Sequence, residues 1–178
     1  GPLAFARRLK EKISRQLKIL TLRKRSTRTL TTTGFHVEPI QKVRPGQVTV
    51  HQTSVDIVVC VHNAPDDVQR CLESIIRYTL PPYRLILVDD GSAGPTQEYL
   101  LSFAHSQGAV LLRNDQARGY TLAANQGLRQ SSAPYVLLLN SDTIVSPNWL
   151  DQMVACAESD SKIGVVGPLS NTASWQSI

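Results

Sequence analysis

Residues 135–142 read YVLLLNSD, and this stretch decides the fold class. A short run of Leu and Val that ends in polar residues is typical of a strand buried within a parallel sheet. The strand leads directly into Asn140, Ser141 and Asp142, so it places a carboxylate at the carboxyl edge of the sheet. Open α/β sheets bind their ligands at that edge. We therefore predict a ligand site around Asp142.

Strand-like and helix-like segments alternate around this stretch. The hydrophobic pattern predicts strands over residues 55–61, 84–88, 109–112, 135–139 and 163–166, and helices over 66–79, 95–106, 121–130 and 147–158. Pro147 suits the first position of the last helix. The alternation predicts an α/β domain over residues 54–178, with a mainly parallel sheet and helices on both faces. Right-handed crossovers would bring all the strand-end residues to one edge.

The N-terminal region differs in charge from the rest of the chain. Residues 1–50 hold twelve basic and two acidic side chains, whereas the remaining residues hold seven basic and twelve acidic ones. Apolar residues at steps of three and four predict a basic amphipathic helix over residues 1–25, and breaker residues predict a linker over 26–53. Gly1 and Pro2 resemble the scar left by tag cleavage, so we expect the natural chain to begin earlier.

The basic helix has three readings. It would lie on an anionic membrane surface, dock on a partner protein, or serve as a solvated connector. We expect no binding to nucleic acid, because no aromatic residues interleave with the charges. The chain has no apolar stretch near 18 residues and no signal-peptide region. We therefore predict a cytoplasmic protein, held peripherally at the inner face of the cell membrane if the helix binds lipid.

The three cysteines do not predict a metal site. Cys60, Cys71 and Cys156 have no metal-ligand spacing, and we expect buried, reduced thiols.

The residues after the first strand, 61–65, contain no glycine, so they exclude a Gly-x-Gly-x-x-Gly dinucleotide motif. A P-loop is also absent. The acidic pair follows the second strand rather than the first, which excludes a receiver-type signalling domain.

Polar residues follow each of the first four predicted strands. They are His62 and Asn63, then residues 89–92 (DDGS), then Asn114, then residues 140–142 (NSD). Each cluster alone is weak, since Asp-Gly is a common turn and Asn or Asp often caps a helix. Together they favour a nucleotide site, where a carboxylate beside a diphosphate would hold Mg²⁺ or Mn²⁺.

Four motifs in this order resemble those of family 2 glycosyltransferases. They are VDIVVCVHN at residues 55–63, LVDDGS at 87–92, Gly119 with ANQG at 124–127, and LNSDT at 139–143. The resemblance implies an inverting enzyme of the GT-A fold that uses nucleotide sugars. The LNSDT variant, with GVVGP at residues 164–168, is most similar to the bacterial branch that includes rhamnosyltransferases of surface polysaccharide assembly.

The resemblance also implies roles for single residues. Asp90 would bind the nucleotide base, and His62 stands where the family often has a stacking Tyr. Asp142 matches the last acid of an Asp-x-Asp motif and would bind the cation, while Asn140 and Ser141 stand where many relatives have acids. Arg118 would reach a phosphate or remain a solvated charge. The predicted nucleotide-binding residues are Cys60, His62, Asn63, Asp90, Asn114, Arg118, Gly119, Asn140 and Ser141.

The implied reaction is a single displacement at the anomeric carbon of the sugar. A carboxylate base would deprotonate a glycan or lipid-linked acceptor, and the cation would stabilise the departing UDP, dTDP or GDP. In the family this base lies beyond the metal motif, so we expect it beyond Ile178 and expect this donor-binding half to be inactive alone. A non-catalytic glycosyltransferase-like module and a sugar nucleotidyltransferase remain as alternatives. The latter should carry a Gly-rich basic loop after its first strand, which residues 62–65 do not supply.

Overall fold

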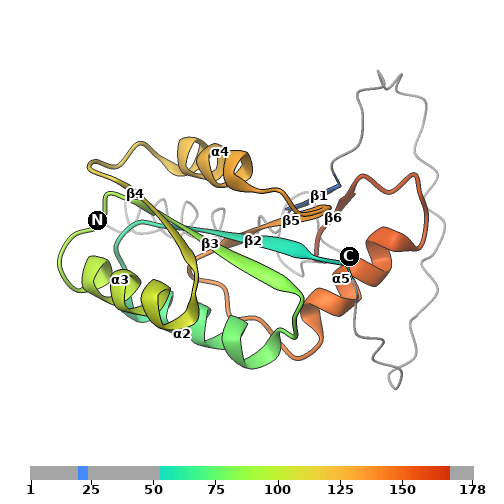
Figure 1. The fold of residues 1–178 in the computed structure, drawn as a ribbon, viewed down its shortest axis with the longest axis horizontal. Coiled ribbons are helices and arrows are strands. Elements are labelled where there is room, and N and C mark those ends of the chain that lie inside the picture. The colour runs from blue at the N-terminus through green and yellow to red at the C-terminus, as the bar shows by residue number, and fades with distance from the viewer. Residues whose placement is uncertain (1–19, 24–52, 169–178) are drawn as a thin grey trace, which may run out of the picture.

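A computed structural model describes residues 20–23 and 53–168 of the chain. In this part the strands are β1 (Leu20–Arg23), β2 (Val55–Val61), β3 (Tyr83–Asp90), β4 (Val110–Asn114), β5 (Tyr135–Asn140) and β6 (Val165–Val166). The helices are α2 (Pro65–Tyr78), α3 (Pro95–Gln107), α4 (Tyr120–Gln130) and α5 (Trp149–Glu158). Figure 1 shows these elements as a sheet between two helical layers.

The sheet has the order β4-β3-β2-β5-β1-β6. β4, β3, β2 and β5 are parallel to one another, so their carboxyl ends meet at one edge. This arrangement confirms the predicted α/β class and the common edge of the strand-end motifs. The strand predicted over residues 55–61 is found at those bounds.

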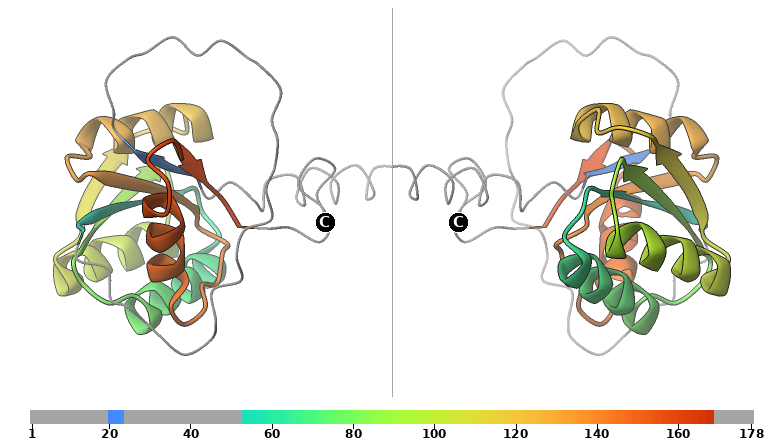
Figure 2. Two further views of the ribbon diagram at one scale, coloured as in Figure 1. Left: turned by 90° about the vertical axis from the view of Figure 1, so that its right-hand side faces the viewer. Right: turned by 90° about the vertical axis from the view of Figure 1, so that its left-hand side faces the viewer.

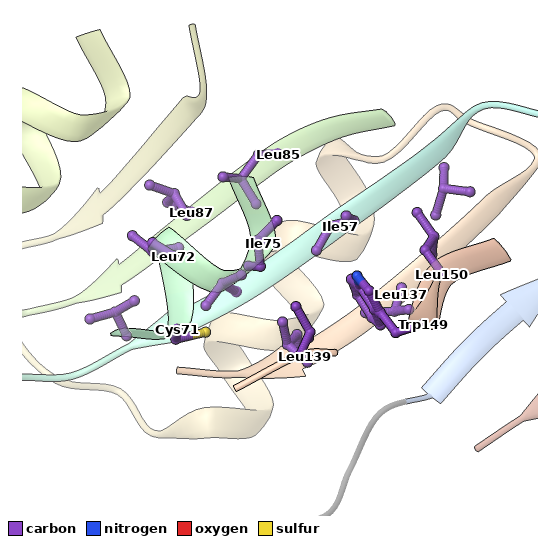
Figure 3. Close-up of a cluster of buried hydrophobic side chains, with 14 of the residues drawn as sticks. Ile57, Cys71, Leu72, Ile75, Leu85, Leu87, Leu137, Leu139, Trp149 and Leu150 are labelled. Atoms are coloured by element: carbon purple, nitrogen blue, oxygen red, sulfur yellow. The ribbon is translucent and has the colours of Figure 1, made fainter. Parts of the chain in front are cut away.

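Helices cover both faces of the sheet, as predicted. α2, α3 and α5 lie on one face and α4 lies on the other (Figure 2). β2 serves both layers because its side chains alternate: Ile57 and Val59 join the larger core, and Val58 packs toward α4. Figure 3 shows the larger core, where Leu72 and Ile75 of α2 lie over the strand residues.

α4 lies unusually close to the sheet at Gly127. A Cβ built on this glycine would lie 2.3 Å from Cγ1 of Val58 on β2. No side chain fits in that space, so glycine sets the distance between α4 and β2. The same helix carries Tyr120 at its first position, so this packing also places one wall of the site described below.

The predicted N-terminal helix is wrong at residues 20–23, which form β1 instead. β1 pairs antiparallel with β5, with Leu20 opposite Leu138 and Arg23 opposite Tyr135, and it pairs antiparallel with β6. The sequence alternates apolar and polar residues over 20–23, which is the period of a strand, and β5 supplies the backbone partners. The rest of residues 1–25 and the linker up to residue 52 lie outside the described residues.

Two predictions near the C-terminus also need correction. The helix predicted to start at Pro147 starts at Trp149, because Asn148 adopts a left-handed conformation (φ 62°) that interrupts the helical backbone. The strand predicted over residues 163–166 is reduced to Val165–Val166 and pairs with β1 rather than extending the parallel set.

Candidate functional site

A cleft of about 570 Å³ opens at the carboxyl edge of the sheet. It lies among the ends of β2, β3 and β5 and the first turns of α2 and α4. Seven of the ten predicted site residues line it, namely Cys60, His62, Asp90, Gly119, Asn140, Ser141 and Asp142. Asn114 and Arg118 instead line a neighbouring hollow of about 480 Å³, and Asn63 lines neither. The structure thus brings most of the predicted residues together.

Asp90 organises the loop that follows β4. The residue is 4% exposed, and its carboxylate accepts hydrogen bonds from the Asn114 side chain (2.9 Å), from the backbone N–H of Arg118 (3.0 Å to each oxygen) and from that of Gly119 (2.7 Å). Burial alone would raise the pKa of Asp90, but these donors outweigh burial and hold the pKa below its ordinary value. Asp90 is therefore an anion in a fixed position.

Asn114 and Arg118 thus act on the cleft indirectly. The Asn114 side chain is a hydrogen-bond donor to Asp90, and Arg118 contributes its backbone N–H to the same carboxylate. The Arg118 side chain is exposed on the neighbouring hollow. Asn114 and Arg118 lie at and just after the end of β4, where the sequence predicted site residues. In the structure they support Asp90 and do not line the cleft.

Gly91 lets the chain after β3 pass close to the loop after β4. It has a φ of 74°, and a Cβ placed on it would lie 2.5 Å from the Ala117 nitrogen and 2.6 Å from the Gln116 carbonyl carbon. Only glycine combines this backbone conformation with such a close approach. The contact holds the loop that donates its N–H groups to Asp90.

Asp89 braces the loop after β3 and joins it to β4, and Asn63 joins the loop after β2 to the loop after β3. Asp89 is 1% exposed, accepts a hydrogen bond from the Ser92 N–H (2.8 Å) and pairs with Arg113, which also donates to the Ser92 carbonyl (2.9 Å). The Asn63 N–H donates to Ser92 Oγ (2.8 Å), and Asn63 Oδ1 accepts from the Ala93 N–H (3.1 Å). Asn63 therefore braces the rim of the cleft.

His62 has both ring nitrogens engaged. Nδ1 lies 2.8 Å from the carbonyl oxygen of Asp90, and because a carbonyl only accepts, Nδ1 carries the hydrogen. Nε2 lies 3.2 Å from the amide nitrogen of Asn63, whose orientation is fixed by the Ala93 N–H on its oxygen, so Nε2 accepts. The ring edge of His62 is thus engaged by hydrogen bonds, with Nδ1 donating and Nε2 accepting, while the residue as a whole is exposed.

The end of β5 is held by α2. The Cys71 thiol donates to the Asn140 carbonyl (Sγ–O 3.5 Å), and the Ser74 hydroxyl accepts from the Val145 N–H (3.0 Å). Burial raises the pKa of Cys71 to about 12, with the nearby Asp142 charge adding to it, so this thiol stays protonated. These bonds fix the turn that presents Ser141 and Asp142 to the cleft.

The strand-end donors suit a hard divalent cation. Asp142 offers a carboxylate, and Ser141 and Asn140 offer neutral oxygen atoms, which is the chemistry that Mg²⁺ and Mn²⁺ prefer. In residues 53–168 no group of three or more His, Cys, Asp or Glu side chains is placed to hold a metal. A cation here would therefore share its coordination with a ligand, as magnesium commonly does with phosphates.

The profile of glycosyl transferase family 2 matches residues 56–172, about two thirds of the chain. The chain belongs to this family. Its GT-A α/β architecture agrees with the assignment, as four parallel strands with helices on both faces carry the motifs at one edge.

Curated relatives of this family 2 domain include poly-beta-1,6-N-acetyl-D-glucosamine synthase of Staphylococcus epidermidis. It is 26% identical over 112 residues, which cover 63% of this chain and 27% of the synthase. The glycosyltransferase AglE of Haloferax volcanii is 30% identical over 105 residues, covering 57% of this chain and 34% of AglE. The chain therefore spans about a third or less of the length of these relatives.

Solved structures share the fold. The mannosyltransferase PcManGT of Pyrobaculum calidifontis, in complex with GDP-Man and Mn²⁺, superposes with a TM-score of 0.58 at 20% identity, covering 68% of this chain and 36% of PcManGT. S. aureus TarS 1-349 in complex with UDP-GlcNAc gives a TM-score of 0.54 at 18% identity, covering 59% and 31%. At these identities the likeness establishes the fold of the family 2 domain.

The sequence did not single out Tyr120 and Asp67, which also line the cleft of this family 2 domain. Asp67 is in the first turn of α2, where its carboxylate pairs with Arg70 (2.6 Å). Burial raises the pKa of Tyr120 to about 12, with Cys60 contributing, so its phenol is neutral. A signal for Tyr120 was present, because it directly follows Gly119.

Helices that would cross a bilayer are not found within the part of this family 2 domain that the structure describes.

Proposed function

We propose that this family 2 domain binds a nucleoside-diphosphate sugar and supplies the donor half of a glycosyl-transfer reaction in glycan biosynthesis, with inversion at the anomeric carbon. One observation carries the proposal: Asp90 and Asp142 line one cleft, although they end different strands on opposite sides of β2. Asp90 is organised by loop N–H groups, and Asp142 lies in a turn with two further oxygen donors. The two ends of the cleft thus suit the two ends of a nucleoside diphosphate.

The base of the nucleotide binds at Asp90 and His62. Three N–H donors already serve the Asp90 oxygens, and one of them, the Arg118 N–H, is shared between both oxygens at 3.0 Å, so an N–H of a base would take over one of its two contacts. The engaged edge of His62 leaves its faces for stacking. A base with an N–H beside its carbonyl groups, as in UDP, dTDP or GDP, satisfies the Asp90 carboxylate.

The diphosphate and a divalent cation bind at the end of β5. Asp142 would hold the cation, with Ser141 and Asn140 beside it, and the use of a divalent cation is supported by PcManGT, a neighbour of the same fold that was solved with GDP-Man and Mn²⁺. When bound, the cation neutralises the diphosphate and stabilises the departing nucleoside diphosphate. The Asp142 carboxylate would fix the position of the ion, and the hydrogen bonds of Cys71 and Ser74 keep the turn in place.

The residues that the structure describes supply the donor site, and we assign no catalytic base among them. The carboxylates that line the cleft are Asp67, Asp90 and Asp142. Asp90 is committed to loop N–H groups, Asp142 to the cation, and Asp67 to its ion pair with Arg70. We therefore expect donor binding without transfer to an acceptor by the 178-residue chain. The bacterial rhamnosyltransferase-like branch remains our prediction for the place of this chain within family 2.

Calorimetric titration of UDP, dTDP and GDP, each with and without Mn²⁺, tests this function. We expect metal-dependent binding of at least one nucleotide, and we expect Asp142→Asn to abolish the effect of Mn²⁺ while leaving the fold intact by circular dichroism. Asp66→Asn is the matched control, because Asp66 is an exposed acid on the same rim that does not line the cleft. Failure of all three nucleotides to bind the wild type with Mn²⁺ would disprove the donor site.

A further inference from the structure

Tyr120 is an aromatic residue on the inner face of α4 that the protein leaves partly uncovered. The buried residues Ala123, Ala124 and Gly127 follow it at three, four and seven positions, which is the spacing of one helical face. Side chains on such a face are normally covered by the sheet, yet Tyr120 is 39% exposed. The ring lines the cleft beside Cys60 and Ala123, so a ligand in the cleft would complete its burial.

The position of Tyr120 is fixed relative to Asp90. The two residues before it, Arg118 and Gly119, donate their backbone N–H groups to the Asp90 carboxylate, the second at 2.7 Å. Gly119 has a φ of 92° and precedes the helix directly, so the bond to Asp90 also sets where α4 begins. A planar group that hydrogen-bonds to Asp90 would therefore lie within reach of the Tyr120 ring.

The surroundings of Tyr120 suit a flat apolar group. Ala117 and Ala123 are the neighbouring lining residues on this side, and their methyl groups leave room for a ring. The Tyr120 phenol is neutral, because burial raises its pKa to about 12, so it presents no charge to a diphosphate. The charged oxygen donors of the cleft lie instead at the end of β5.

We propose that Tyr120 forms an aromatic wall against which the nucleobase of the donor stacks while Asp90 accepts a hydrogen bond from the edge of the same base. The inference rests on the proposed function, because it assumes a nucleotide in the cleft. Tyr120 then favours ligands that carry a base, whichever base it is. It contributes nothing to the binding of the diphosphate itself. Stacking on an aromatic ring is tolerant of base identity, so Asp90 rather than Tyr120 distinguishes one base from another.

Titration of variants of the full chain tests this wall, with whichever of UDP, dTDP and GDP binds the wild type most tightly. We expect Tyr120→Ala to weaken that nucleotide on the order of tenfold and at least fivefold, as base–aromatic stacking predicts. Tyr120→Leu keeps apolar bulk but no aromatic face, and it should weaken binding to a similar extent. Tyr120→Phe should rescue binding to within about twofold, because the proposal assigns the effect to the ring.

Two controls separate stacking from loss of structure. Leu122 is 46% exposed on the same helix and does not line the cleft, so Leu122→Ala should bind the nucleotide as the wild type does. Binding of pyrophosphate with Mn²⁺ should be equal in Tyr120→Ala and the wild type, because that probe has no base. A Tyr120→Leu variant that is folded and binds within twofold of the wild type would overturn the wall, as would a Phe variant that fails to rescue. A wild type that binds none of the three nucleotides overturns the proposed function and the wall with it, whereas nucleotide binding that is unchanged in Tyr120→Leu overturns the wall alone.

Discussion

The carboxylate of Asp90 at the end of β3 accepts a hydrogen bond of 2.7 Å from the backbone N–H of Gly119 at the start of α4. The two residues are 29 positions apart in the chain. This bond joins the predicted base-reading residue to the loop that follows β4, so a change at Asp90 reaches both the stability of the domain and its ligand site.

We expect Asp90→Asn to destabilise the domain by about 2 kcal/mol. The amide replaces an oxygen that accepts from the Arg118 and Gly119 N–H groups with a group that donates, and buried donors without acceptors are costly. Urea unfolding followed by circular dichroism measures the change. Asp66→Asn, at an exposed position, should stay within about 0.5 kcal/mol of the wild type. An equal effect of the two substitutions would contradict the role given to Asp90.

Gly91→Ala should disturb the cleft more than Gly108→Ala does. Both glycines have positive φ values, 74° and 64°, so both variants carry the strain of an alanine at positive φ, about 1 kcal/mol. At Gly91 the new methyl would also meet the Ala117 nitrogen at 2.5 Å, whereas at Gly108 nothing lies within 4 Å. We expect a further loss of about 1–3 kcal/mol at Gly91.

The measurement for this pair is urea unfolding together with nucleotide titration. Nucleotide affinity should fall in Gly91→Ala, because the loop that serves Asp90 is displaced, and should be retained in Gly108→Ala. A result in which both variants lose the same stability and the same affinity would show that the backbone conformation, and not the close contact, is what matters.

Gly127→Ala should destabilise the domain although alanine favours helices by about 1 kcal/mol over glycine. The added methyl would lie 2.3 Å from Cγ1 of Val58 and would push α4 away from β2. We expect a net loss of about 1–3 kcal/mol in thermal or urea unfolding. The double variant Gly127→Ala with Val58→Ala should recover part of the loss relative to the sum of the single changes, and additive losses would refute the contact.

Asp56 should make the stability of the fold depend on pH in the acid range, without affecting nucleotide binding in the cleft. Its carboxylate, at the opposite edge of the sheet, pairs with Arg84 (2.8 Å) and accepts from the N–H groups of Ser132 (2.7 Å) and Ala133 (3.0 Å). Burial acts to raise the pKa of Asp56, but Arg84 and the two N–H groups outweigh it and the pKa is lowered.

The sign of the pH dependence follows from this direction. Because the folded pKa lies below the unfolded value near 3.8, the stabilisation is complete above that value and is lost as pH falls through the folded pKa. Asp90 contributes in the same direction. Asp56→Asn should flatten the loss of stability as pH falls below about 3.8 and leave nucleotide affinity at pH 7 unchanged. A steeper acid loss in the variant would be inconsistent with the lowered pKa.

The sequence predicted what local pattern controls. The strand over residues 55–61 and the convergence of Asp90 and Asp142 followed from apolar runs that end in acids, since parallel strands place such ends together. β1 was missed because its strand period is short and its conformation depends on pairing with β5, far along the chain. Tyr120 was missed because its exposure depends on where α4 begins, which Asp90 fixes through space.

The clips between the loops around the cleft have a consequence for binding thermodynamics. Asn63 joins the loop after β2 to the loop after β3 through the Ser92 hydroxyl and the Ala93 N–H. Asp90, the last residue of β3, joins that strand to Gly119 at the start of α4. These hydrogen bonds are made within the protein and need no ligand to hold the loops, so we expect little conformational entropy to be lost on association. Ligand contacts at this rim therefore contribute to affinity with little offset from ordering the protein, and loosening Asn63 would appear as weaker binding with a more unfavourable entropy.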